Sequence, residues 1–148
     1  MFKIFYANKD ATIYESAGTY NTGVDELLEI GKRYGTDGST LQKSRFALKF
    51  DTTEISASLS KYGQTVNNCK FMLQLYTSHA KNLPAEYTIS AKLLAQDWQN
   101  GIGIESDPTT DGIAWNYPVS GSTWISSSQH VQIASSSLYI SGSGLGGS

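Results

Sequence analysis

Hydrophobic and polar residues alternate with a period of two along much of the chain, which is the pattern of a β-strand with one buried face. In the segment 44–51, every second residue is large and apolar, and the segment 69–78 alternates in the same way. Both segments are therefore predicted as strands, and we expect the apolar set of the second to point into a core. The two sets are Phe46, Leu48 and Phe50 in the first segment and Cys69, Phe71, Leu73 and Leu75 in the second.

Further strands are predicted around these two segments. The run 87–98 alternates as well, and although its Ala, Lys and Leu residues also suit a helix, Thr88, Ile89 and Ser90 favour a strand. Shorter strand candidates lie at residues 2–6, 11–15, 27–32, 130–135 and 137–141. Turn-forming residues such as Asn, Asp and Gly separate the candidates, at residues 21–23, 35–38, 61–63, 100–101 and 111–112.

Many short strands separated by tight turns predict an all-β fold, either an antiparallel β-sandwich or a jelly roll. A parallel α/β fold would need long helical segments between the strands, and the sequence has no such pattern. The length of 148 residues is that of one domain. We expect a single β-sandwich domain over residues 1–140 and a Gly/Ser-rich tail at residues 141–148 that continues into a longer protein.

The charge of the chain narrows the choice of partners. The net charge at pH 7 is -2, and the basic residues are scattered along the sequence. Nucleic-acid binding needs a clustered basic face, and docking to a membrane surface needs a polybasic run. No apolar stretch is long enough to span a bilayer. We therefore expect neither nucleic acid nor a membrane as a partner.

The cysteine content and the first residues bear on the cellular compartment. The single cysteine, Cys69, cannot form a disulfide within the chain, and we interpret it as a small buried apolar residue rather than a reactive thiol. Residues 1–10 lack the apolar core and the cleavage site of a secretory signal peptide. We expect the protein to be made and kept in a cytosol, or to leave it as part of an assembly.

All three tryptophans lie in the segment 97–124, among Gly, Ser, Thr and Asp residues typical of loops. Aromatic rings in such a segment either stack on the sugar rings of a ligand or pack on the end of a sandwich. We favour packing. Trp98 directly follows an alternating run and is expected in the core, and Trp115, Tyr117 and Trp124 are the candidates for ligand contact.

Three carboxyl groups of the same segment, those of Glu105, Asp107 and Asp111, could supply oxygen ligands for a structural calcium ion. They lack the spacing of an EF-hand, and we favour the alternative that the Asp side chains cap turns. The two histidines, His79 and His130, are not spaced as metal ligands. Apart from this calcium ion, we expect no cofactor.

The sequence carries no convincing catalytic signature. A G-x-G-x-x-G pattern at residues 142–147 lies in the tail, without the following helix on which phosphate binding by this motif depends. No serine occupies the G-x-S-x-G turn of a hydrolase. We expect a protein that is not an enzyme, and a lyase or hydrolase is the third hypothesis.

Short motifs follow one another in a recognisable order along residues 9–124: KDATIYES, YNTG, LLEIG, SRFALKFD, ISAS, CKFMLQLY, QDWQNGIG and GIAWN. This order resembles the DNRLRE-type β-sandwich module, which occurs in disaggregatase-related carbohydrate-binding proteins and in large surface proteins. The residues that match the pattern of the module are Asp10, Ala11, Tyr14, Asn21, Gly23, Leu28, Ile30, Gly31, Arg45, Leu48, Phe50, Asp51, Leu73, Leu75, Tyr76, Trp98, Trp115 and Asn116.

The segments WQNGIG, TTDGIAWNY and GSTW are similar to versions of this module in virion structural proteins of marine tailed phages. The resemblance implies a β-sandwich virion protein on the tail or the capsid surface, assembled in the cytoplasm of the host bacterium. It also implies a role in assembly or host-surface adhesion, with other virion proteins, further copies of the chain and a host-surface glycan as partners. By the same resemblance, Trp98 and Trp115 are expected as internal plugs, and Tyr117 and Trp124, farther out along the loop, are the better candidates for outward contact. The alternative is a carbohydrate-binding module of a secreted glycan-active protein.

The sequence departs from such modules after the Gly/Ser-rich stretch SGSGLGG. In the modules, the chain continues there into an aromatic strand that closes the sandwich, whereas this sequence stops at Ser148. We expect either a fragment of a longer protein or a final strand that a partner supplies by β-augmentation, and we favour the fragment.

Overall fold

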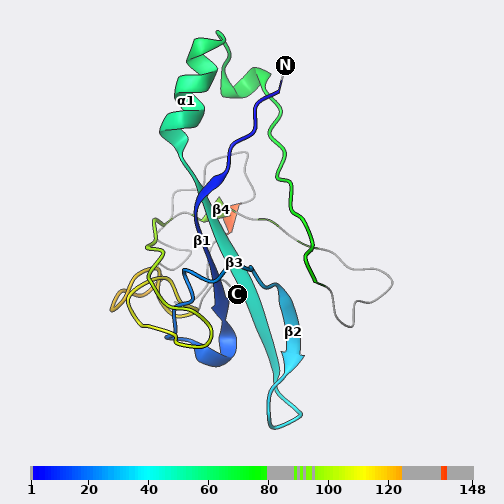
Figure 1. The fold of residues 1–148 in the computed structure, drawn as a ribbon, viewed down its shortest axis with the longest axis vertical. Helices are drawn as coiled ribbons and strands as arrows, with labels where there is room; N and C mark the ends of the chain where they lie inside the picture. The colour runs from blue at the N-terminus through cyan, green and yellow to red at the C-terminus, as the bar shows by residue number, and fades with distance from the viewer. Residues whose placement is uncertain are drawn as a thin grey trace. The chain divides into compact units, whose positions relative to one another are not determined.

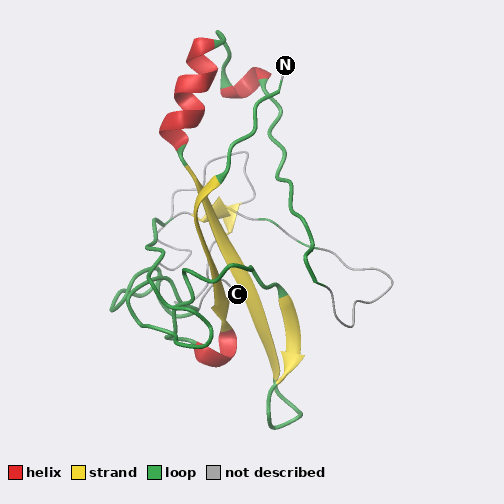
Figure 2. Ribbon diagram, viewed as in Figure 1, coloured by secondary structure: helices red, strands yellow, loops and turns green. Residues whose placement is uncertain are grey.

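An antiparallel sheet of three strands is the main regular structure of the described residues (Figures 1 and 2). Its strands are β1 (Ala7–Tyr14), β2 (Gly31–Tyr34) and β3 (Leu41–Phe50), and β3 lies between the other two. The prediction of a mostly-β fold is confirmed, whereas the sandwich or jelly-roll arrangement stays a prediction.

The computed structural model describes residues 2–79, 89, 91, 93–94, 96–124 and 138–139. Contacts divide the chain into two compact units, and we describe each unit by itself. The first unit comprises Met1–Asn8 and Lys49–Ile89, and the second comprises Lys9–Leu48 and Ser90–Ser148. The predicted single domain over residues 1–140 stays a prediction.

Strands β2 and β3 form a hairpin. The paired residues are Gly31 with Ser44, Lys32 with Lys43, Arg33 with Gln42 and Tyr34 with Leu41. Asp37 closes the turn, because its Oδ1 accepts the backbone N–H groups of Ser39 at 3.1 Å and of Thr40 at 3.0 Å. The Thr40 hydroxyl also donates to this carboxylate, and together these bonds hold the pKa of Asp37 well below its usual range. The turn predicted at residues 35–38 is therefore confirmed.

The face of β3 that carries Ala47 is its more deeply buried face. Ala47 is buried, whereas Phe46, Leu48 and Phe50 on the other face are half-buried. Ala47 is buried in a cluster that contains large tryptophan rings, and these rings leave room for only a small side chain at this position. The predicted strand is confirmed.

A second, short sheet pairs β4 (Leu93–Leu94) with β5 (Leu138–Tyr139). Both strands fall within segments predicted as strands. They run parallel, which differs from the purely antiparallel sheet that the sequence predicts. Parallel neighbours cannot be joined by a tight hairpin, so turn signals do not indicate such a pairing. The predicted strand at residues 130–135 and the predicted tail at residues 141–148 lie outside the described residues.

An α-helix, α1 (Thr52–Lys61), begins directly after β3. Asp51 is its N-cap, since its Oδ1 accepts the backbone N–H groups of Thr53 at 2.8 Å and of Glu54 at 3.3 Å. Gly63 lies just past the helix end with φ +62, a conformation that favours glycine. Strand alternation does not predict this helix, although an Asp followed three residues later by Glu is a common helix start.

The remaining helices are short. They are the 3-10 helices η1 (Glu15–Ala17) and η2 (Val66–Asn68). Neither α1 nor any other helix in the described part of the chain has the length and apolar composition that crossing a bilayer requires.

Two segments that were predicted as strands belong to no strand in the structure, residues 2–6 and residues 69–78. The side chains expected on the inner face of the second segment, such as Phe71 and Leu73, are exposed. Cys69 is half-buried rather than part of the core. Alternation does not by itself make a strand, because the backbone groups also need a ladder partner. Neither segment has such a partner in the described sheets.

Replacing Asp51 by Ala is expected to destabilise α1. The variant loses the acceptor for two N–H groups of the first turn, and the free energy of unfolding should fall by about 1 kcal/mol, a typical cost of losing an N-cap. Asp51→Asn is the matched control, because Asn caps a helix about as well as Asp. Urea unfolding followed by circular dichroism measures the stability of both variants. If Asp51→Ala were as stable as Asp51→Asn, the capping role of Asp51 would be contradicted.

Candidate functional site

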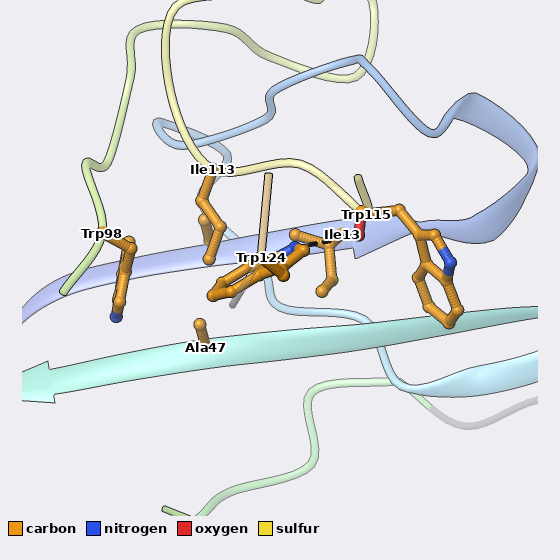
Figure 3. Packing of buried hydrophobic residues seen from close by; sticks show 7 residues of the cluster. Ile13, Ala47, Trp98, Ile113, Trp115 and Trp124 are labelled. Atoms are coloured by element: carbon orange, nitrogen blue, oxygen red, sulfur yellow. Dashed lines mark hydrogen bonds between the residues drawn. The ribbon is translucent and has the colours of Figure 1, made fainter. Parts of the chain in front are cut away.

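A cluster of buried apolar residues lies in the second unit (Figure 3). Its members come from β1, from β3 and from the segment that contains the three tryptophans. They are Ala11, Ile13, Ala47, Trp98, Ile113, Trp115 and Trp124. The tryptophan segment is therefore part of the hydrophobic core of this unit.

Trp124 lies in the middle of the cluster in Figure 3, with Trp98 on one side and Trp115 on the other. The residue is only 6% exposed, and its Nε1 donates to the backbone oxygen of Trp115 at 3.0 Å. A buried indole N–H needs an acceptor, so this bond fixes the direction in which the ring faces.

The aromatic residues of this segment differ in burial. The prediction that Trp98 and Trp115 are internal plugs is confirmed, since both are buried. The prediction that Trp124 points outward is wrong, because its ring lies inside the cluster and its N–H is bonded there. Tyr117 is half-buried in a turn that its backbone closes with Ala114. Trp115 and Trp124 therefore present almost no ring surface to a ligand, and ligand contact by Tyr117 stays a prediction.

Two basic side chains lie over tryptophan rings of the cluster. The guanidinium carbon of Arg45 is 4.7 Å from the ring centroid of Trp115, and Lys9 Nζ is 6.0 Å from that of Trp98. Lys9 also donates to the backbone oxygen of Trp98 at 3.2 Å. Burial lowers the pKa of Arg45, and the negative charge of Glu15 opposes this shift. These cation–π contacts cover ring faces that a stacking ligand would otherwise need.

Asn21 is a buried polar residue whose side chain joins the turn after β1 to the tryptophan segment within the second unit. Its side chain is 0% exposed, and its Nδ2 donates to the backbone oxygens of Asn100 at 2.7 Å and of Ile113 at 2.8 Å. Its Oδ1 accepts the backbone N–H groups of Gly23 and of Gly103, both at 3.1 Å. The side-chain amide thus makes two donor and two acceptor bonds, which is the full capacity of an asparagine side chain.

Asn100 makes a second set of bonds between the same segments. Its Oδ1 accepts the backbone N–H of Asp10 at 3.1 Å, and its Nδ2 donates to the backbone oxygen of Gly23. The backbone of Asn21 adds a bond from its N–H to the oxygen of Thr109 at 2.7 Å. We call Asn21 and Asn100, with these bonds, the asparagine clasp.

The clasp requires glycine at the positions packed against it. A Cβ atom on Gly101 would lie 2.1 Å from Asn21 Oδ1, and the backbone of Gly101 has φ +77. A Cβ atom on Gly23 would lie 1.8 Å from the backbone oxygen of Asn100. Both distances are far below van der Waals contact, so any other residue at these positions would push the two segments apart.

The three predicted calcium ligands lie in or beside turns of the tryptophan segment. Asp111 Oδ1 accepts the Thr109 hydroxyl, which lowers the pKa of the carboxyl group. The backbone N–H of Glu105 donates to Asp25 Oδ1 at 2.9 Å, and Asp107 forms a backbone-bonded turn with Ile104.

The structure therefore does not bring Glu105, Asp107 and Asp111 together as metal ligands. Within the described ranges, no three His, Cys, Asp or Glu side chains are grouped to hold a metal ion. His79 is exposed, and His130 lies outside the described residues.

Tyr14, the last residue of β1, is a buried phenol. Burial raises its pKa, and the negative charges of Glu29 and Glu105 raise it further. The guanidinium carbon of Arg33 lies 5.8 Å from the centroid of its ring. Tyr14 therefore stays protonated at neutral pH and acts as a packing and hydrogen-bonding residue.

Comparison with known proteins identifies no family. No protein-family model matches the chain, and no curated protein and no solved structure matches it.

Replacing Asn21 by Asp is expected to break the clasp. The carboxylate would have no N–H to donate, and it would face the carbonyl oxygens of Asn100 and Ile113 in a buried site. The free energy of unfolding should fall by about 3–5 kcal/mol, as when a buried charge is left unpaired. Denaturant unfolding measures the loss. Asn67→Asp, which adds the same charge at an exposed position, is the control, and a loss no larger than in this control would contradict the role of Asn21.

Truncating Trp124 to Ala is expected to lower the free energy of unfolding by about 3–5 kcal/mol, the cost of removing a large buried aromatic side chain. Tyr117→Ala, at a half-buried position, should cost clearly less. Thermal and denaturant unfolding compare the two variants. A Trp124→Ala variant that unfolds like the wild type but loses affinity for a glycan would instead identify Trp124 as a ligand platform.

Proposed function

We propose that the chain is a non-enzymatic structural module of a tailed-phage virion, sited on the tail or the capsid surface, that holds virion subunits together. The observation that carries the proposal is a set of large apolar side chains exposed on the first unit. They are Phe2, Ile4, Tyr6, Phe71, Met72, Leu73, Leu75 and Tyr76. Exposed apolar residues gathered in short segments are typical of protein–protein contact surfaces.

The segment 71–76 is the main part of this surface. Met72 and Tyr76 are 83% and 86% exposed, and Phe71, Leu73 and Leu75 between and beside them are exposed as well. Apart from Gln74, the side chains of this segment are thus apolar and open to solvent. Pairing with a strand of a neighbouring subunit would bury these side chains and satisfy the backbone groups.

Further copies of this chain are the partner that fits this segment. Residues 71–79 contain no Asp, Glu, Lys or Arg, and neither Pro nor Gly interrupts them. Uncharged segments of β-forming residues pair readily with identical segments. The net charge of -2 is small, so that repulsion between copies is weak.

The motifs similar to DNRLRE-type modules of virion proteins support the same proposal. Among the matched residues, Ala11, Asn21, Gly23, Trp98 and Trp115 belong to the asparagine clasp or the aromatic cluster or pack directly against them. The residues that carry the resemblance therefore include those that stabilise the second unit. The β-sandwich or jelly-roll architecture of such modules, and assembly in the cytoplasm of a host bacterium, are parts of the proposal.

A carbohydrate-binding module of a secreted glycan-active protein is the alternative. Stacking on a sugar ring would then depend on Tyr117, the one predicted ligand-binding aromatic residue that is not buried. Glycan-array binding that is lost in Tyr117→Ala, by a protein that stays monomeric, would favour this alternative over the virion proposal.

The oligomeric state of the full chain tests the proposed function. We expect sedimentation velocity to show an oligomer of fixed stoichiometry. In the double variant Met72→Ser/Tyr76→Ser, the dissociation constant of this oligomer should rise at least about tenfold, because one or two exposed anchor residues are lost. Ile102→Ser is the matched control, because Ile102 is 71% exposed but lies in the second unit.

Both variants replace exposed side chains, so their folding should be unaffected, which circular dichroism checks. A wild-type chain that stays monomeric at every concentration would contradict self-assembly. So would a double variant that associates as tightly as the wild type.

A further inference from the structure

Asn100 and Gly101 form the single Asn–Gly step of the chain. In flexible peptides, Asn before Gly is prone to lose its side-chain amide, because glycine has no side chain to hinder attack by its own backbone nitrogen. The folded chain places this reactive step inside the asparagine clasp, where both polar atoms of the Asn100 side chain are bonded.

The bonds of the clasp oppose the reaction. Asn100 Nδ2, the atom that must leave, donates to the backbone oxygen of Gly23, and Oδ1 accepts the N–H of Asp10 at 3.1 Å. The backbone oxygen of Asn100 accepts Asn21 Nδ2 at 2.7 Å, so the backbone before Gly101 is held as well. Ring closure requires the Asn100 side chain to turn onto its own backbone and to give up its bonds to both neighbouring segments.

We propose that Asn100–Gly101 is a deamidation site that the asparagine clasp holds closed, so that Asn100 reacts only when this part of the chain opens. When the segment around Asn100 opens locally, the Asn100–Gly101 peptide becomes able to react. After deamidation the segment can no longer return to its closed form.

The reaction needs water and no other reagent. The backbone nitrogen of Gly101 attacks Cγ of Asn100, a new C–N bond forms, and the bond from Cγ to Nδ2 breaks. Nδ2 leaves as ammonia with the proton that the Gly101 nitrogen gives up. Water then opens the resulting succinimide at one of its two carbonyls, and the ring nitrogen takes a proton back. The products are aspartate or isoaspartate at position 100, and no atom changes its oxidation state.

Neither product can rebuild the clasp. Aspartate has no N–H to donate to the Gly23 oxygen, and its negative charge would face that oxygen. Isoaspartate adds a carbon to the backbone before Gly101, where a Cβ atom on Gly101 would already lie 2.1 Å from Asn21 Oδ1. A chain that has reacted therefore cannot close this segment in its original form.

The rate of deamidation in the folded and the unfolded full chain tests the proposal. Samples are incubated in mildly alkaline buffer with and without urea, and peptide mass spectrometry measures the conversion of amide to acid at position 100. We expect deamidation to be at least about tenfold slower in the folded chain, because the reaction must wait for local opening. Equal rates in the two states would overturn the proposal.

Asn67, which is exposed and lies outside the clasp, is the internal control. Its deamidation should differ much less between the two conditions, and protection as strong as at Asn100 would overturn a specific role of the clasp. The product itself is tested with Asn100→Asp. This variant should unfold at a lower urea concentration than the Asn67→Asp control, and an unchanged midpoint would overturn the inference that the reacted chain cannot close.

Discussion

The second unit depends on the side-chain amide of Asn21. It bonds four backbone groups at once, two as donor and two as acceptor, and these groups belong to the turn after β1 and to the tryptophan segment. A buried amide is stabilising only when each of its polar atoms has a partner. The same bonds position Ile113, a member of the aromatic cluster, and explain why the neighbouring positions must be glycine. One polar side chain therefore controls both the backbone path of the segment and the packing beside it.

The sequence predicts those parts of the fold that depend on local patterns. The strand predicted at 44–51, which the structure shows at 41–50, and the turn at 35–38 follow from alternation and turn composition, and the interior position of Trp98 follows from the alternating run before it. Residues 69–78 have an equally clear alternation but form no strand, since pairing depends on a partner that the segment itself does not encode. The helix after Asp51 has a start signal, but the apolar alternation of the preceding strand obscures it.

The candidate site could be predicted less well than the fold. Asn21 and Asn100 are visible in the sequence only as turn residues, and full burial of an asparagine is not apparent from its neighbours. Trp124 is a candidate for outward contact in the sequence because it lies farther out along the loop-rich segment, yet its N–H donates to an acceptor inside the cluster. An aromatic residue in a loop-rich segment thus becomes a core residue when the loop folds back over a sheet. Exposed apolar side chains occur in both units, and those of the segment 71–76 lie in the first unit.

The distance along the chain between the two halves of the clasp has a consequence during synthesis. The bonds from Asn21 Nδ2 to the oxygens of Asn100 and Ile113 join residues that are 79 and 92 positions apart. While a ribosome extends the chain, β1 and the β2–β3 hairpin are complete long before either acceptor has been added. The nascent chain must keep Asn21 hydrated and the apolar face of its sheet uncovered until the tryptophan segment emerges. Such late, non-local closure is slow and leaves an aggregation-prone intermediate, so that this protein is expected to need a chaperone most before its tryptophan segment has been translated.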